Sequence, residues 1–401
     1  MNNISIYSDK CTGCSICSKV CPSKCIKMQP NNLGEIYPVV DNNLCVNCGI
    51  CVNKCHLTNT ELPSSYPQQA FVAWTLDDDL RLHSASGGIA SAIYKYAFKK
   101  NAKCFGVCYK YGEGAKFIEL KSTDDIKLCQ NSKYVFSMLE TVASKIKEYV
   151  ISGETVFLPA LPCQIAAIRS FLGKDYENLI LIDIICHGVC SEKYLNDHIE
   201  SINKCKETID KVYFRDPIFG TNQFIFSLYA KDRIIYKAKV KGTDVYQIGY
   251  HKALTYREGC YSCKYAQKKR SGDMTISDFS GLGKIKHYSG KHDSVSCVLV
   301  NSEKGRLLFD NLLNESLIFA DERPLDEALL YEKQLKSPSV KHPQREIFLD
   351  IYKQESNFEI AAQKALATEV RKNRIDTLFC LSQIKHFSEK VKSKIQRTLS
   401  R

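Results

Sequence analysis

Two closely similar cysteine runs lie within the first 55 residues of this 401-residue chain, and they limit what this segment can fold around. In each run, two residues separate the first three cysteines from one another, and three residues separate the third from the fourth. The first run consists of Cys11, Cys14, Cys17 and Cys21, and the second of Cys45, Cys48, Cys51 and Cys55. Three thiolates at this spacing hold three corners of a 4Fe–4S cubane, while the fourth cysteine binds the neighbouring cluster. Residues 1–60 therefore predict a ferredoxin-type domain with two 4Fe–4S clusters.

The exchange of the fourth cysteine predicts how the ligands divide. We expect one cluster on Cys11, Cys14, Cys17 and Cys55, and the other on Cys45, Cys48, Cys51 and Cys21. A pair of zinc sites is the alternative, but zinc sites usually use two C-x2-C pairs. His56 follows the second run where Pro22 follows the first, a change that leaves the ligands intact. Cys25 is left over, and we expect it to pack as a small apolar side chain.

The composition favours metal chemistry over disulfides. The chain begins "MNNISIYSDK", without the basic and apolar regions of a signal peptide, and it has no apolar run long enough to span a membrane. We therefore expect a cytoplasmic protein whose 20 cysteines stay reduced. The formal charge of +12 counts every cysteine as neutral, and thiolates on clusters would offset part of it. Because no basic motif with interleaved aromatic residues accompanies this charge, we expect no nucleic-acid binding.

The rest of the chain is typical of a mixed α/β (α+β) protein. A polar stretch over residues 58–69 predicts a linker. Strand-like and helix-like segments then alternate up to about residue 203, which favours an open α/β sheet. Short strands over residues 209–241 predict an antiparallel extension, and residues from about 326 onward are mostly helical. The predicted boundaries are 1–60, 70–150, 151–325 and 326–401.

A third cysteine set is scattered over this second region. Cys163 lies where a predicted strand gives way to a helix, Cys186 ends the next strand, and Cys260 and Cys263 form a close pair. Strand ends in an open α/β sheet share the edge where ligands bind, so these residues can meet there. Alone, each is ambiguous, because a single cysteine is usually a buried packing residue and a C-x2-C pair is often half of a zinc site.

A family resemblance bears on this third set. The stretches "LPALPCQIAAIRSFL", "DIICHGV", "CYSCKYAQKKRSGDMTISDFSGLG" and "SVSCVLVNSEKG" resemble the beta-subunit family of deazaflavin (coenzyme F-420) hydrogenases and dehydrogenases. "HSASGGIASAIYKYA" and "NSKYVFS" are similar to its N-terminal half. The resemblance covers about residues 70–320, so that 70–150 and 151–325 would be two parts of one iron–sulfur flavoprotein domain. It implies a third 4Fe–4S cluster on Cys163, Cys186, Cys260 and Cys263. Ser280 replaces the usual tryptophan of the family, and Asn131 replaces a glycine.

Two segments are candidates for binding a flavin. Ser86, Gly87 and Gly88 precede an amphipathic helix, whose free N–H groups attract phosphate, although a plain helix cap explains these residues equally well. Ser132, Lys133 and Tyr134 offer a hydroxyl, a cation and an aromatic ring, and an exposed loop is the alternative. The resemblance favours FAD at both segments.

Together these features predict an oxidoreductase that passes single electrons through 4Fe–4S clusters to FAD, which exchanges them with a two-electron acceptor. The alternatives are a non-catalytic electron-transfer subunit and a cluster-based redox sensor. The expected partners are an electron donor or acceptor protein, such as ferredoxin, or a partner oxidoreductase subunit, and the chain is compatible with an oligomer. Residues Ile384 to Leu399 predict a basic amphipathic helix that docks on protein, with peripheral membrane contact as the alternative.

Overall fold

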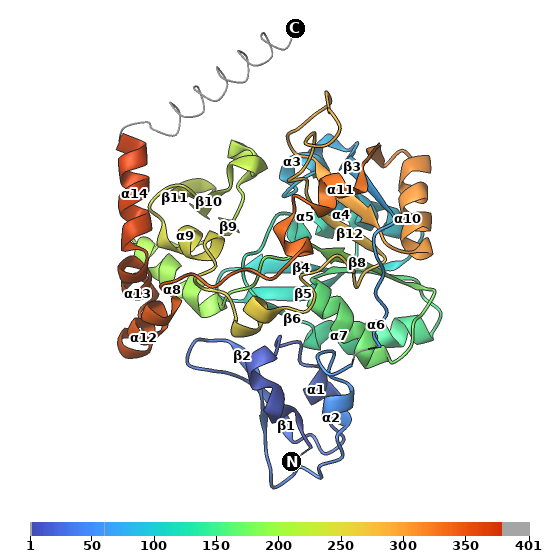
Figure 1. Ribbon diagram of the computed structural model, residues 1–401, viewed down its shortest axis with the longest axis horizontal. Coiled ribbons are helices and arrows are strands. Elements are labelled where there is room, and N and C mark those ends of the chain that lie inside the picture. Colours follow the sequence, from blue (N-terminus) through green and yellow to red (C-terminus); the bar gives the residue numbers. More distant parts are fainter. Residues whose placement is uncertain (1, 60, 379–401) are drawn as a thin grey trace.

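The computed structural model describes residues 2–59 and 61–378 (Figure 1). A central nine-stranded sheet dominates the structure, with strand order β14-β3-β13-β12-β8-β7-β4-β5-β6. The strands are β3 (Gln69–Thr75), β4 (Lys103–Lys110), β5 (Gly114–Leu120), β6 (Ser137–Met138), β7 (Val156–Ala160), β8 (Leu179–Ile184), β12 (Met274–Asp278), β13 (Ser296–Val300) and β14 (Ile318–Arg323). Strands β4, β7, β8 and β12 run parallel to one another, whereas β13 is antiparallel to both β12 and β3. The predicted mixed α/β class is confirmed.

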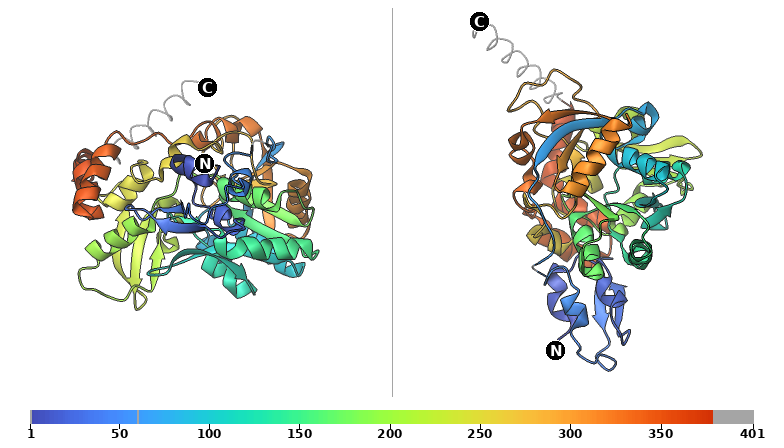
Figure 2. Two further views of the ribbon diagram at one scale, coloured as in Figure 1. Left: turned by 90° about the horizontal axis from the view of Figure 1, so that it is seen from below. Right: turned by 90° about the vertical axis from the view of Figure 1, so that its right-hand side faces the viewer.

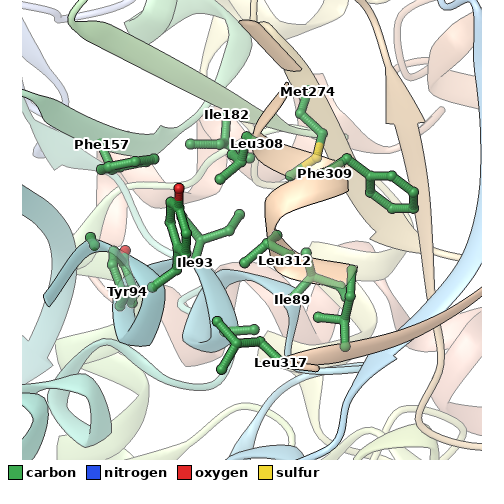
Figure 3. Close-up of a cluster of buried hydrophobic side chains, with 14 of the residues drawn as sticks. Ile89, Ile93, Tyr94, Phe157, Ile182, Met274, Leu308, Phe309, Leu312 and Leu317 are labelled. Carbon is green, nitrogen blue, oxygen red and sulfur yellow. The ribbon is translucent and has the colours of Figure 1, made fainter. Parts of the chain in front are cut away.

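Helices cover both faces of this sheet. They are α3 (Asp78–His83), α4 (Ile89–Lys99), α5 (Ile126–Cys129), α6 (Glu140–Ile151), α7 (Pro162–Leu172) and α10 (Glu303–Asn314). Side chains alternate between the faces along each strand, so Phe157 packs with α4 and α10 while Leu158 packs with α6 and α7. Figure 3 shows the first of these layers, in which Ile93 of α4 meets Leu312 of α10. The parallel strands therefore end at one edge between two helical layers, as expected for an open α/β sheet.

A second core lies beside the central sheet. It combines the antiparallel sheet β9 (Lys211–Tyr213), β10 (Ile225–Ala230) and β11 (Arg233–Lys239) with helices α8 (Glu192–Ile202), α9 (Val245–His251), α12 (Arg345–Glu355) and α13 (Phe358–Ala365). The predicted antiparallel extension is thus present. The short helix α11 (Leu325–Leu329) precedes α12, and α14 (Ala367–Leu378) follows α13. Phe348, Tyr352 and Phe358 are fully buried, so the described part of the predicted helical tail belongs to this core. The segment from Ile384 to Leu399 lies outside the described residues.

The N-terminal segment forms a small unit of its own below the central sheet in Figure 1 and at the lower end of the right-hand view in Figure 2. It contains a 3-10 helix (Ile4–Lys10), α1 (Ile16–Lys19), α2 (Ile50–Asn53) and the hairpin of β1 (Ile26–Pro30) with β2 (Ile36–Val40). The following polar stretch is not free along its whole length, because Ser65 exchanges backbone hydrogen bonds of 3.0 and 2.8 Å with Arg270.

Candidate iron–sulfur and flavin sites

Each N-terminal cysteine run folds as a tight loop that ends in a short helix. Gly13, Ser15 and Gly49 adopt left-handed backbone conformations, with φ of 71°, 67° and 73°. At Gly13 a Cβ atom would lie 2.8 Å from the Phe136 ring and 3.1 Å from the Arg257 guanidinium, so the loop passes close to the rest of the molecule. The glycine that follows Cys11 by two residues is therefore required both by the turn and by the contact.

The structure brings Cys55 of the second run to the first run. One cavity, called cavity B here, is lined by cysteines of both runs, namely Cys11, Cys14, Cys17 and Cys55. Burial raises the pKa of Cys17, and the charges of the other three thiols raise it further. This grouping is the arrangement expected when the fourth cysteine of one run serves the cluster of the other.

The second predicted set lies closer to solvent. Burial raises the pKa of Cys51, and the charge of Cys21 adds to that rise. Cys48 is exposed and Cys45 is half-buried. Cys25 is buried as predicted, but its sulfur lies 3.4 Å from that of Cys21, so it packs directly against a proposed ligand.

Four cysteines from three separate segments line a further cavity, called cavity A, at the carboxyl edge of the central sheet. Cys163 is the second residue of α7, and Cys186 lies two residues beyond β8. Cys260 lies in the 3-10 turn Glu258–Ser262, and Cys263 follows that turn directly. The third predicted set is thus brought together in space. Its role as a ligand set remains a prediction.

Cavities A and B are neighbours. Cys11 and Thr12 line both of them, and the charge of Cys14 contributes to the raised pKa of Cys163. In the described part of the chain, no three His, Cys, Asp or Glu side chains converge closely enough to hold a single metal ion. The cysteines of the first and third predicted sets line cavities B and A.

The N-terminal segment is fastened to the wall of cavity A by Arg257, which is 3% exposed. Its guanidinium donates to the carbonyl oxygens of Cys11 and Ile36, at 2.7 and 2.6 Å. It also lies 4.0 Å from the ring centre of Tyr37, a cation–π contact. A second fastening uses Ser170 of α7, whose hydroxyl donates to the Lys54 carbonyl at 3.0 Å.

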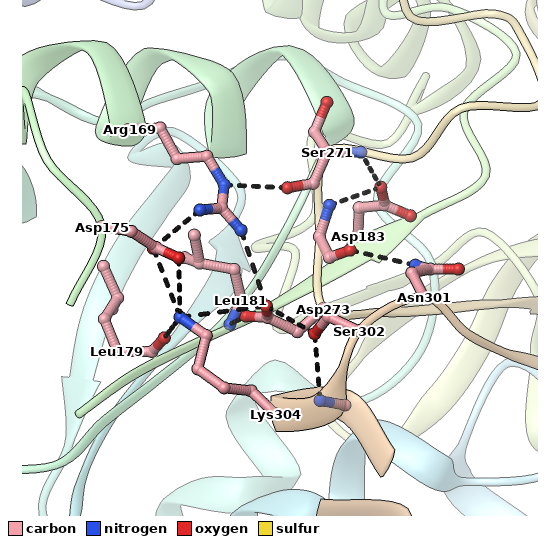
Figure 4. Close-up of polar contacts among 12 residues, drawn as sticks. Arg169, Asp175, Leu179, Leu181, Asp183, Ser271, Asp273, Asn301, Ser302 and Lys304 are labelled. Atoms are coloured by element: carbon pink, nitrogen blue, oxygen red, sulfur yellow. Dashed lines mark hydrogen bonds and ion pairs between the residues drawn. The ribbon is translucent and has the colours of Figure 1, made fainter. Parts of the chain in front are cut away.

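A buried polar network positions Arg270 in the wall of cavity A. Arg270 donates to Asp183 of β8 at 3.0 Å, and Asp183 also accepts from the backbone N–H groups of Ser271 and Gly272 at 3.1 and 3.0 Å. Figure 4 shows how Arg169 of α7 reaches the Ser271 carbonyl in the same network, at 3.0 Å. The network therefore holds the strand that precedes Cys186 and the segment that follows Cys263 in one fixed arrangement.

The predicted flavin segments are linked through Gln130, which lies two residues before Ser132. Its amide donates to the Leu80 carbonyl of α3 at 3.0 Å and to the Ser91 hydroxyl in the first turn of α4 at 3.4 Å. The glycines before α4 have a packing role: a Cβ on Gly87 would lie 2.5 Å from the Ala73 carbonyl oxygen, and Gly88 has φ of 79°. The close packing of α4 on β3 thus accounts for both glycines, and phosphate binding there stays a prediction. Ser86 donates to the Val295 carbonyl at 2.6 Å.

The loop over residues 131–134 is ordered by its own polar groups. Asn131 has φ of 67°, and its amide donates to the Arg215 carbonyl at 2.6 Å. A left-handed residue at this position explains the family's usual glycine, since asparagine is one of the few other residues that tolerate this conformation. The Ser132 N–H donates to the side-chain oxygen of Asn131 at 2.8 Å, and the Tyr134 ring stacks on Tyr250 with 4.3 Å between ring centres.

Lys133 is the residue here that best fits an anionic cofactor. Its ammonium donates to the Gln130 carbonyl at 2.6 Å, and the neighbouring groups that raise its pKa are the thiols of Cys129 and Cys108 rather than a carboxylate. Burial lowers the pKa of Lys133 to about 8. A phosphate group would supply the missing counter-charge.

Comparisons with known proteins identify two domains. Residues 10–59 match the family "4Fe-4S dicluster domain", and residues 153–324 match the family of the C terminus of the coenzyme F420 hydrogenase/dehydrogenase beta subunit. The chain carries this beta-subunit domain behind a dicluster domain. The first of these domains is described as holding two 4Fe–4S clusters, and the second is described as part of a hydrogenase or dehydrogenase subunit.

A solved structure that is similar to this chain can be named. It is the F420-reducing NiFe hydrogenase complex from Methanosarcina barkeri, determined with xenon, to which the similarity has a TM-score of 0.45 and 16% sequence identity over 79% of this chain and 92% of that chain. A comparison with curated proteins found no match. No helix in residues 2–59 and 61–378 is both long and apolar enough to cross a membrane.

The thiols of the dicluster and beta-subunit domains suit a cationic core. Burial raises the pKa of Cys14 to about 12, and it also raises that of Cys260 to about 12. Without a metal these thiols stay protonated at neutral pH, so an iron–sulfur core must displace their protons. Arg257 and Arg270 in the wall of cavity A add positive charge beside the thiolates. The residues present therefore fit a cluster.

Several residues of the beta-subunit domain line the site but were not predicted from the sequence. Arg257, Tyr265 and Arg270 all line cavity A and all lie within seven residues of Cys260 or Cys263. That proximity was the signal available in the sequence. Ser280, at the position of the family's tryptophan, donates to Glu332 at 2.9 Å, so it ties its loop to the segment after α11. His187 is exposed at the rim of cavity A, and Ser339 donates to its carbonyl at 2.6 Å.

Proposed function

We propose that this chain is an oxidoreductase that carries single electrons from its dicluster domain to a third 4Fe–4S cluster in cavity A and on to FAD. The observation that carries this proposal is the gathering of Cys163, Cys186, Cys260 and Cys263 around one cavity whose wall also contains Cys11. Clusters exchange one electron at a time, and a flavin exchanges electrons singly or in pairs with a two-electron acceptor.

The exposure of the cysteines supports an electron-transfer path that reaches solvent at one end, in the dicluster domain. The thiols of cavity A are at most half-exposed, and Cys17 is buried, whereas Cys48 of the dicluster domain is exposed. Leu44 and Val46 beside it are 56% and 68% exposed. Exposed apolar side chains around a protein's redox centre suit transient contact with another protein. A one-electron carrier, such as a ferredoxin or a partner oxidoreductase subunit, would exchange electrons here.

The other end of the path is proposed to be the flavin. Lys133 would neutralise a phosphate of FAD, and the N–H groups of the first turn of α4 would add further donors. Next to Lys133, Tyr134 stacks on Tyr250, and the Tyr250 hydroxyl donates to the carbonyl of Gly188 in the wall of cavity A. The flavin and the third cluster would therefore be neighbours. Deazaflavin is one candidate for the two-electron acceptor, because it gives the matched family its description.

The test is to purify the chain anaerobically, add FAD, and measure flavin released on denaturation. Dithionite-reduced protein should then reduce a two-electron acceptor, with deazaflavin, nicotinamide dinucleotides and quinones as the compounds compared. Turnover by the isolated chain supports an enzyme. If flavin is bound but no acceptor is reduced without another subunit, the chain is an electron-transfer subunit, and if no flavin binds, the proposed FAD end of the path is wrong.

A further inference from the structure

The two cavities are connected by a buried hydrogen-bonded group centred on His56. Its Nε2 lies 2.9 Å from the hydroxyl of Thr12, and its Nδ1 lies 2.6 Å from the hydroxyl of Tyr265. Thr12 follows Cys11 and His56 follows Cys55, so both adjoin ligands proposed for cavity B. Tyr265 lies two residues after Cys263 and lines cavity A. The group therefore spans from one proposed ligand set to the other.

This contact is confined on every side. His56 is 1% exposed and Tyr265 is 9% exposed. The Tyr265 hydroxyl also approaches the His56 carbonyl at 3.3 Å, and the Lys264 ammonium donates to that same carbonyl. Backbone and side chain of His56 are thus both held by the residues that follow the Cys260–Cys263 pair.

The identity of residue 56 makes the contact specific. Pro22 occupies the corresponding position after the first run, and proline has no side-chain donor or acceptor. The histidine follows Cys55, the last cysteine of the second run, which lines cavity B. The presence of histidine at position 56, where the first run has proline, therefore leaves the ligands unchanged and provides a side chain that reaches Tyr265.

We propose that His56 and Tyr265 are positioning residues that set the separation and relative orientation of the clusters in cavities B and A. The step served is the transfer of one electron between the two clusters, in which no covalent bond forms or breaks. A change in the distance or orientation between the two clusters would slow this electron transfer even when all ligands are in place, because misplacement of reacting centres alone can lower a rate strongly. This inference rests on the proposed third cluster.

The test compares variants that keep all twelve proposed ligands. Tyr265→Phe removes only the hydroxyl that meets His56. Tyr261→Phe is the matched control, because Tyr261 lies between Cys260 and Cys263 but its hydroxyl donates to Ala253 within the same domain, at 2.8 Å. His56→Asn places an amide near the position of Nδ1, and His56→Gln places it near that of Nε2, so Asn keeps the partner Tyr265 and Gln does not.

The readouts are iron content, the magnetic interaction between reduced clusters in EPR spectra, and the midpoint potentials from redox titration. Tyr265→Phe and His56→Gln should keep the wild-type iron content but weaken the interaction and shift a cluster potential. Tyr261→Phe should match the wild type, and His56→Asn should restore most of the interaction. Unchanged spectra and potentials in fully loaded Tyr265→Phe protein would overturn the inference. A wild-type protein with only two clusters would instead overturn the proposed function on which it rests.

Discussion

Arg257 donates its Nε hydrogen to the carbonyl oxygen of Cys11 at 2.7 Å, which joins the turn before Cys260 to the first cysteine of the dicluster domain. The same guanidinium bonds the Ile36 carbonyl. Arg257→Leu should therefore loosen the docked dicluster domain by about 3 kcal/mol, since hydrogen bonds from a charged group are worth about 1.5–3 kcal/mol each. Amide hydrogen exchange over residues 10–37 should become about a hundredfold faster.

A surface arginine provides the control for this variant. Arg233→Leu removes a side chain that is 62% exposed and pairs with Glu207, so exchange over residues 10–37 should stay at the wild-type rate. Equal exchange in the Arg257 and Arg233 variants would contradict the role given to Arg257.

The local elements of this fold were predictable, and so was the approach of Cys163 to Cys186, whereas the position of Cys260 and Cys263 was not. Val156–Ala160 is a short, fully buried strand, and Cys163 follows it at the start of α7, as the change from strand to helix pattern indicated. Because β7 and β8 are parallel neighbours, Cys163 and Cys186 had to reach one edge.

The docking of the two domains was not predictable from the sequence. It depends on single side chains that reach backbone carbonyls, such as Arg257 to Cys11, and such contacts leave no periodic pattern. For His56 the only signal was its departure from the proline of the first run. The role of Gly87 was likewise hidden, since a helix start that binds phosphate and one that packs against a strand use the same residue.

His198 makes the second core sensitive to alkaline pH. Burial alone would lower its pKa, but the carboxylates of Asp244 and Glu359, at 3.0 and 2.8 Å, outweigh burial and raise the pKa to about 9. The unfolded value is about 6.5, so this stabilisation is complete below pH 6.5 and is lost as the pH rises through 9. It amounts to about 3 kcal/mol at most, from about 1.4 kcal/mol per pKa unit. The free energy of unfolding, measured with denaturant, should fall between pH 7 and 10 in the wild type. His198→Gln should remove most of this dependence on pH.

At position 131, replacement by glycine should destabilise the protein less than replacement by alanine. A left-handed conformation costs an ordinary residue about 1–2 kcal/mol, and Asn131 has φ of 67°. Both Asn131→Gly and Asn131→Ala lose the bond to the Arg215 carbonyl, so the difference between them isolates the backbone term. Thermal unfolding should show Ala as the less stable variant by about that amount. Equal melting temperatures would show that the loop relaxes to another conformation.

Lys133 should control flavin retention without affecting the clusters. Replacing it by methionine removes a half-buried cation proposed to meet a phosphate, and the loss of such a bond corresponds to about a tenfold to hundredfold weaker affinity. Lys127→Met is the control, because Lys127 lies six residues earlier in the chain and is exposed. Flavin fluorescence after denaturation and iron content should be measured together. Full flavin in Lys133→Met would exclude this residue from the site.

The most direct measurement is the iron and acid-labile sulfide content of anaerobically reconstituted protein. Three 4Fe–4S clusters require about twelve of each per chain. The double variant Cys163→Ser with Cys260→Ser should hold about eight of each, since it leaves both dicluster ligand sets intact. Cys297→Ser, which changes a buried cysteine of β13 away from the cavities, should keep about twelve. A wild-type value near eight that the double variant does not lower would contradict the account of cavity A.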